Sequence, residues 1–406
     1  MTKIARLTVA AIGTAAIFAS AAFAQIQPHI LNISRDERIA LNALQTATAT
    51  PDRAAQDTAL NTARAAAQSA SARYAVANLQ FQLGRARGDA QMQNQAIDAL
   101  VASGVPQGAE LAPLLAAQAS RAYSAGDLRG ADRLLTRVVE LQPNNPVLVA
   151  DHAQYKARLG ERPQAVTLFQ RAIELQQAAG QPAPQSWHQR ALALAFDGRL
   201  APQGIALARG LVAAYPSPSN WRDALLAYRQ LGTVDATLDV DIGRLMRATG
   251  ALFGERDYLE LARSLDGTSL PGEAKAVLDE GVQRGQLNAS EAEVRQLITR
   301  TNPRATTARN GLARARTQAL AADTGAPALA AADAQFGFGN YAEAAELYRA
   351  ALQKGGQDPN LVNSRLGAAL ALAGQRAEAE AAWRAVTGPR ADLAGFWMTW
   401  LARRAS

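Results

Sequence analysis

Three histidines are the residues with the greatest metal-binding or catalytic potential in this sequence, and their spacing does not form a site. His29, His152 and His188 are its only histidines, and cysteine is absent. A helical zinc site needs two ligands four residues apart, and none of these histidines has such a partner. Without cysteine there are no disulfides, thiolate nucleophiles or lipoprotein anchor. We expect no metal, no cofactor and no catalytic residue, and a surface or groove-lining position for His152 and His188.

One glycine-rich segment has the spacing of a dinucleotide-binding loop. Gly337, Gly339 and Ala342 fit the pattern G-x-G-x-x-A. That loop needs a preceding strand, whereas an alanine-rich helical run precedes Gly337, so we interpret the segment as a turn between helices. No Walker A loop, serine-hydrolase elbow or zinc-protease motif occurs. Carboxylates are scattered over helix faces. An acid–base pair of carboxylates that are distant in sequence but close in space stays an open alternative. The sequence therefore gives no support for an enzyme.

Arginines form one concentrated basic run, in a stretch without any acid between Glu293 and Asp323. Its members are Arg295, Arg300, Arg304, Arg309, Arg314 and Arg316. Two interpretations stay open: a solvated helix face, or a contact for an anionic partner such as an acidic protein, a polysaccharide or a lipid phosphate, which guanidinium groups bind well. We do not expect nucleic acid, because no aromatic residues interleave with the arginines.

The end of the chain is aromatic in a sequence that is otherwise poor in aromatics. Trp397, Trp400 and Leu401 are three or four residues apart, so one helix face carries all three. Packing on the preceding helices would bury this face, and we predict a capping helix shielded from solvent. A helix that docks on a partner or a membrane surface is the alternative.

The elements that position these residues repeat with a fixed period. The matching pairs, each 34 residues apart, are Gly126 and Gly160, Ala131 and Ala165, Leu135 and Phe169, Val138 and Ala172, and Leu141 and Leu175. This is the length of one helix–turn–helix repeat. Glycine suits the left-handed end of a first helix, alanine allows two helices to cross closely, and the larger residues share one helix face.

The stretch resembles the tetratricopeptide repeat (TPR) family, whose second helix reads Ala-x3-Phe…Pro. Ala165 and Phe169 match the first pair, Ala131 and Pro143 the longer spacing, and Leu366-Gly367 the Leu-Gly pair of the family. The resemblance covers most of 112–386 in about seven units. It implies an all-α, right-handed solenoid of TPR-like helical hairpins, with a break near 288–322 left open. Because no catalytic motif occurs in the sequence, we expect no enzymatic activity.

By the same resemblance, first helices would line a concave groove that accepts a partner peptide or helix. The side chains expected there are Tyr123, Gln154, Arg158, His188, Gln189, Arg222 and Asp223. We therefore expect a protein–protein interaction scaffold with protein partners of polar or acidic character, and no small-molecule substrate. The alternative is a cell-envelope assembly or polysaccharide-export accessory at a membrane surface.

The predicted organisation has six parts. They are a signal peptide at 1–24, degenerate helical hairpins at 25–111, TPR-like repeats at 112–287, a divergent helical segment at 288–324, further TPR-like repeats at 325–389 and the capping helix at 390–406. The formal charge of +7, carried almost wholly by arginine, is compatible with ordinary solubility.

The first testable prediction concerns export. Lys3 and Arg6 precede a short apolar segment, and Ala22-Phe23-Ala24 is a small-x-small cleavage site. The mature protein is therefore expected in the periplasm, beginning at Gln25. N-terminal sequencing of the native protein checks this expectation, and a chain that begins at Met1 or Thr2 contradicts it.

Overall fold

The computed structural model describes residues 32–404 and is helical throughout, without a strand in that range. The predicted signal peptide and His29 lie outside the described residues. Contacts divide the chain into two compact units between Ala183 and Pro184. We call them the N-terminal unit and the C-terminal unit and describe each by itself.

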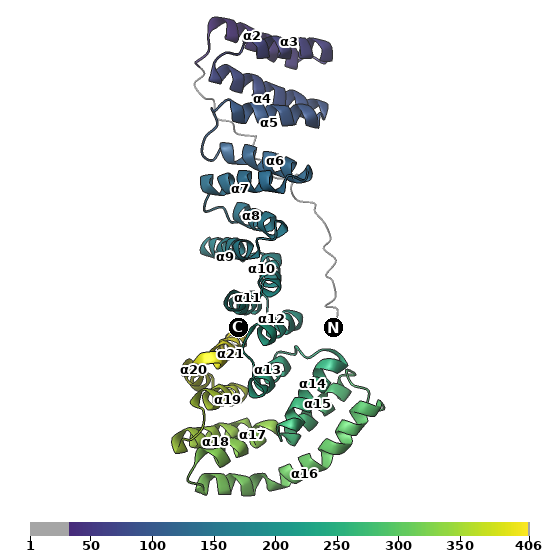
Figure 1. Ribbon diagram of the computed structural model, residues 1–406, viewed down its shortest axis with the longest axis vertical. Helices are drawn as coiled ribbons and strands as arrows, with labels where there is room; N and C mark the ends of the chain where they lie inside the picture. The colour runs from purple at the N-terminus through teal and green to yellow at the C-terminus, as the bar shows by residue number, and fades with distance from the viewer. Residues whose placement is uncertain (1–31, 405–406) are drawn as a thin grey trace. The chain divides into compact units, whose positions relative to one another are not determined.

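The N-terminal unit consists of four helical hairpins, α2–α3, α4–α5, α6–α7 and α8–α9, in which each helix packs on the next (Figure 1). Its helices are α2 (Arg35–Thr48), α3 (Arg53–Ala66), α4 (Ala70–Arg87), α5 (Ala90–Ala102), α6 (Leu111–Ser124), α7 (Leu128–Leu141), α8 (Pro146–Arg158) and α9 (Arg162–Ala178). This arrangement confirms the predicted all-α, TPR-like hairpin fold.

The repeat residues occupy the positions that their chemistry requires. Gly126 and Gly160 follow the first helices with φ of 84° and 80°, a conformation that costs other residues strain. Ala131 and Ala165 are 0% exposed where the two helices of a hairpin cross, and Phe169 is also buried. Small and large side chains alternate in this way so that each hairpin buries its apolar face against its neighbours.

The C-terminal unit contains twelve α-helices among the described residues. They are α10 (Gln185–Asp197), α11 (Ala201–Ala214), α12 (Pro218–Leu231), α13 (Ala236–Ala248), α14 (Gly254–Gly267), α15 (Pro271–Gln283), α16 (Ala292–Ala321), α17 (Gly325–Gly337), α18 (Tyr341–Lys354), α19 (Pro359–Leu372), α20 (Arg376–Arg384) and α21 (Ala391–Arg403). A short 3-10 helix, η2 (Gly388–Arg390), precedes α21.

The divergent segment is one continuous 30-residue helix, α16, in place of a hairpin. Pro303 lies inside it. Helices α15 and α17 pack against α16 and also against each other. Residues 288–322, where the sequence left an interruption of the solenoid undecided, are therefore mostly helical. The chain divides into its two units after Ala183 instead. The glycine-rich segment is the turn between α17 and α18, as predicted.

The C-terminal helix α21 is buried on its aromatic face, which confirms the predicted shielding. Trp397 is 1% and Trp400 6% exposed. The ring of Trp397 stacks on that of Trp383 in α20, with 5.9 Å between centroids. Phe396 of the same helix lies 5.6 Å from the ring of Tyr228 in α12.

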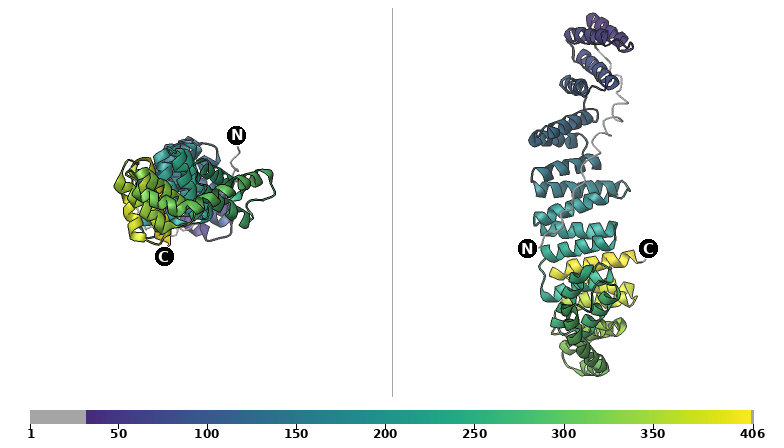
Figure 2. Two further views of the ribbon diagram at one scale, coloured as in Figure 1. Left: turned by 90° about the horizontal axis from the view of Figure 1, so that it is seen from below. Right: turned by 90° about the vertical axis from the view of Figure 1, so that its right-hand side faces the viewer.

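Helix α21 thus does more than cover the last hairpin. It also packs on α11, almost two hundred residues earlier in the chain (Figure 2). The guanidinium of Arg403 donates a hydrogen bond to the carbonyl of Ala213, and the hydroxyl of Tyr228 donates one to the carbonyl of Pro389 at 3.0 Å. The C-terminal unit therefore closes on itself.

The buried crossing at Ala165 gives the second prediction. Ala165→Leu is expected to lower the free energy of unfolding by about 1–3 kcal/mol, because three extra carbons enter a filled crossing. Urea unfolding followed by circular dichroism measures the change. Ala178→Leu, on an exposed position of the same helix, is the control and should have little effect. An Ala165→Leu midpoint equal to wild type would contradict the assigned packing.

Candidate functional site

Two neighbouring first helices of the N-terminal unit present an aromatic and cationic cluster. Tyr123 lies near the C-terminus of α6, and Tyr155 lies in the equivalent part of α8. Their rings meet edge to face with 5.0 Å between centroids, and the guanidinium of Arg158 lies 5.5 Å from the centroid of Tyr123. Arg158 is exposed and forms no ion pair within the described residues. We call Tyr123, Asp151, Gln154, Tyr155 and Arg158 the Tyr123 cluster.

Asp151 gives the cluster a charge that changes near neutral pH. Burial raises the pKa of its carboxyl to about 6. Nε2 of Gln154 donates a hydrogen bond to Oδ1 of Asp151 at 3.3 Å. The cluster therefore combines a permanent positive charge, two aromatic rings and a carboxyl that protonates in mildly acidic solution.

His152 lies behind this cluster and has a structural role. Its side chain is 5% exposed, and Nε2 lies 2.9 Å from Oδ1 of Asp132 in α7. Nζ of Lys156 donates to the other oxygen of Asp132 at 2.8 Å and to Glu161 at 2.9 Å. Burial lowers the pKa of His152 despite its acidic neighbour. The expectation of a surface or groove-lining position for His152 is wrong, because the ring bridges two packed helices.

His188 is also buried, which corrects its expected place in a groove. It is 2% exposed, and neither ring nitrogen has a hydrogen-bond partner within the described residues. Its ring packs edge to face on Tyr215 at 6.0 Å. Burial lowers the pKa of His188, so the neutral form is favoured. The side chain serves packing and is not accessible to a partner.

The other side chains predicted to line a groove in the C-terminal unit are Gln189, Arg222 and Asp223. The first two form hydrogen bonds with neighbouring helices, and the third is exposed. Both oxygens of Asp257 accept hydrogen bonds from Arg222, at 2.8 and 3.0 Å. Nε2 of Gln189 lies 3.4 Å from Oδ1 of Asn220. Asp223 is exposed beside Arg222. Among the predicted side chains, the structure thus brings Tyr123 and Arg158 into direct contact with each other.

The basic run lies along α16, where about half of its charges are already paired. Arg300 and Arg304 both bind Asp266, and Arg316 binds Glu346 at 2.8 Å. The other three are exposed and form no ion pair within the described residues: Arg295, Arg309 and Arg314. The run is therefore a mixture of structural ion pairs and free cations.

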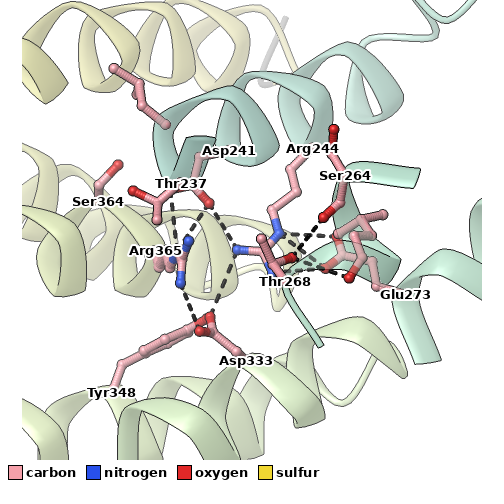
Figure 3. A network of polar contacts seen from close by, with 12 residues as sticks. Thr237, Asp241, Arg244, Ser264, Thr268, Glu273, Asp333, Tyr348, Ser364 and Arg365 are labelled. Carbon is pink, nitrogen blue, oxygen red and sulfur yellow. Dashed lines mark hydrogen bonds and ion pairs between the residues drawn. The ribbon is translucent and has the colours of Figure 1, made fainter. Parts of the chain in front are cut away.

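A buried ion network that no sequence pattern indicated lies at the centre of the C-terminal unit (Figure 3). The carboxylate of Asp241 in α13 accepts hydrogen bonds from Arg244 at 2.9 Å, Arg365 of α19 at 3.0 Å and Arg390 of η2 at 2.6 Å. Burial alone would raise the pKa of Asp241, but the three guanidinium groups outweigh burial and lower it.

Two further carboxylates complete this network. Glu273 of α15 accepts from Arg244 at 2.7 Å, and Asp333 of α17 accepts from Arg365 at 2.6 Å and from the hydroxyl of Tyr348 at 2.6 Å. We call the six charged residues the central ion network: Asp241, Arg244, Glu273, Asp333, Arg365 and Arg390. Three acids balance three arginines, so side chains of the unit itself fill its centre.

Two kinds of site find no support in the described residues. No group of three or more histidine, aspartate or glutamate side chains there could hold a metal ion. In residues 32–404, no helix has both the length and the apolar character that crossing a membrane demands.

Comparisons with known proteins add little to this geometry. No family model and no curated protein matches the chain. Solved structures that resemble it include Pseudomonas aeruginosa PilF, with 16% identity and a TM-score of 0.26 over 57% of this chain and 90% of that one. The TPR2AB-domain:pHSP90 complex of yeast Sti1 has 14% identity and a TM-score of 0.26 over 73% and 96%. Naa15/Naa10 bound to HypK-THB has 13% identity and a TM-score of 0.26 over 90% and 68%.

At these TM-scores the likeness carries no functional information. The description as TPR-like rests on the 34-residue period and on the hairpin packing of the chain itself.

The third prediction tests the central ion network. Asp241→Asn removes one carboxylate from among three buried arginines, and we expect a loss of about 3–5 kcal/mol in unfolding free energy. All five tryptophans lie at or after Trp187, so tryptophan fluorescence during urea unfolding reports on the C-terminal unit. Glu346→Gln, which breaks an exposed ion pair, is the control and should cost less than about 1 kcal/mol.

The pH dependence of the same variant has a definite sign. Because the folded pKa of Asp241 is lowered, its contribution to stability is present above the unfolded pKa of about 3.9 and is lost as the pH falls below that value. Wild type should therefore approach the stability of Asp241→Asn in strong acid. Equal stability of the two proteins at pH 7 would contradict the network.

Proposed function

We propose that this protein is an exported interaction scaffold that binds a segment of a protein partner on the α6–α8 face of its N-terminal unit. The observation that carries the proposal is the Tyr123 cluster, in which two tyrosines and an exposed arginine meet on adjacent first helices. Tyrosine and arginine are enriched among the residues that dominate binding energy at interfaces. Tyrosine contributes a large contact area with few rotatable bonds, and arginine contributes a charge and several hydrogen-bond donors.

The charges of the cluster favour an acidic partner segment. Arg158 is exposed, and its contact in the part of the chain that the structure describes is with an aromatic ring rather than with an acid. An incoming carboxylate would therefore gain a guanidinium partner without displacing another. Asp151 opposes such a ligand when it is ionised, so its protonation should strengthen binding.

The C-terminal unit is a weaker candidate for the same task. Its centre is filled by the central ion network, Arg222 is held by Asp257, and His188 is buried. Separating Arg222 or a residue of the central ion network from its partner would leave a buried charge unsatisfied.

The alternative function, an envelope-assembly or polysaccharide-export accessory at a membrane surface, needs an exposed aromatic tail beside an exposed basic run. Trp397 and Trp400 are buried, and three arginines of the run are paired. We therefore favour the interaction scaffold. Its periplasmic location is part of the proposal and is supported by the N-terminal sequence pattern alone.

The fourth prediction tests the binding surface by affinity capture from an envelope fraction. Tagged mature protein and an Arg158→Glu variant are compared for each protein that wild type recovers. We expect the variant to lose recovery of the specific partner about tenfold or more, because charge reversal replaces attraction by repulsion. Arg129→Glu, an exposed charge reversal on α7 of the neighbouring hairpin, is the control and should retain recovery.

A pH series sharpens the same test. Partner recovery should be greater at pH 5.5 than at pH 7.5, because Asp151, whose pKa is about 6, is mostly protonated at the lower value. Asp151→Asn should remove this difference. Equal recovery by wild type and Arg158→Glu would place the binding surface elsewhere.

A further inference from the structure

A cavity of about 420 Å³ opens in the C-terminal unit, apart from the central ion network. It lies between α15, α16 and the turn that joins α17 to α18. Its charged and aromatic walls come from Arg247, Lys275, Asp279, Arg309, Phe338 and Tyr341. The volume is within the range of cavities that hold small molecules.

The turn that carried the G-x-G-x-x-A spacing forms one wall of this cavity. Gly337 lies so close to the first turn of α15 that a Cβ there would be 3.0 Å from the backbone nitrogen of Glu273. Glycine therefore lets the turn seat directly on α15 without a side chain in between. Phe338 follows it, with the guanidinium of Arg309 5.0 Å from its ring centroid.

The cations around the cavity are unequally paired. Arg247 binds Glu280 at 2.6 Å, and Lys275 binds Asp279 at 2.7 Å in an exposed pair within one helix. Exposed pairs of this kind are weak and open easily. Arg309 forms no ion pair within the described residues and is positioned by Phe338. An anion that enters the cavity would meet one free guanidinium and one easily released ammonium group.

We propose that this cavity binds a small polyvalent oxyanion, either a polycarboxylate or an organic phosphate, through Arg309 and Lys275. Guanidinium groups bind both anions by paired hydrogen bonds, and the ammonium group adds a point charge. The site is independent of the proposed partner surface, because it lies wholly in the C-terminal unit. It also gives a function to Arg309, an arginine of the basic run without an ion pair in the described residues, which lines this cavity.

Isothermal titration calorimetry of the full mature chain tests this site at low ionic strength, with citrate, pyrophosphate and uncharged glucose as probes. We expect citrate or pyrophosphate to bind, glucose not to bind, and added salt to weaken the binding. Binding of citrate alone would assign a polycarboxylate, and binding of pyrophosphate alone would assign a phosphate. Binding of both would support the shared oxyanion chemistry.

Arg309→Gln should weaken the anion about tenfold or more. The matched control is Arg295→Gln, because Arg295 is an exposed, unpaired arginine of the same helix outside the cavity, and its loss should change affinity less than twofold. Lys275→Gln is a second variant, and tryptophan fluorescence verifies that each variant is folded. The proposal is overturned if neither anion binds, or if Arg309→Gln and Arg295→Gln have equal effects.

Discussion

The carboxylate of Asp241 is the group on which the C-terminal unit depends. It is buried and contacts arginines from α13, α19 and η2, which are up to 149 residues away in sequence. A buried charge is costly unless it is paired and hydrogen bonded. The three helical segments must therefore meet at one point, and an arrangement that separates them leaves an uncompensated charge. The presence of the network is therefore no measure of the net stability of the unit, because ion pairs of this kind often gain little over apolar packing.

From residue 32 to Ala183, the N-terminal unit shows no comparable buried ion network. Its hairpins contact their sequence neighbours, and its cohesion comes from small residues at helix crossings, such as Ala131 and Ala165, beside larger ones such as Phe169. On α6 and α8, the partly exposed Tyr123 and Tyr155 and the exposed Arg158 gather in one cluster. The two units are therefore built from similar hairpins but differ in their side chains. The first has an accessible side-chain cluster, and the second has a filled centre.

The sequence predicted the parts of this structure that have local causes. Period, glycine turns, alanine crossings and the buried face of Trp397 and Trp400 follow from spacings within one or two helices. The central ion network could not be predicted, because Asp241 and Arg390 carry no mark of their pairing in either local sequence. His188 was misplaced because helical spacing gives the face of a residue but not what packs over that face. Tyr155 was not predicted as a site residue, although it follows Gln154 directly. Its place in the cluster depends on the contact between its ring and that of Tyr123, which the sequence does not show.

Closure of the C-terminal unit by α21 also constrains the order in which the chain can fold. The hairpins of the N-terminal unit need only contacts between neighbours, so each can form soon after its second helix emerges from the ribosome. The C-terminal unit waits for Arg390 and Phe396, which are synthesised long after the helices that they contact. Its helices α11 to α13 therefore remain without their final partners until α21 has been synthesised, and long loops must close before those contacts form. We therefore expect the first unit to fold hairpin by hairpin during synthesis, and the second to complete its packing only when distant segments meet.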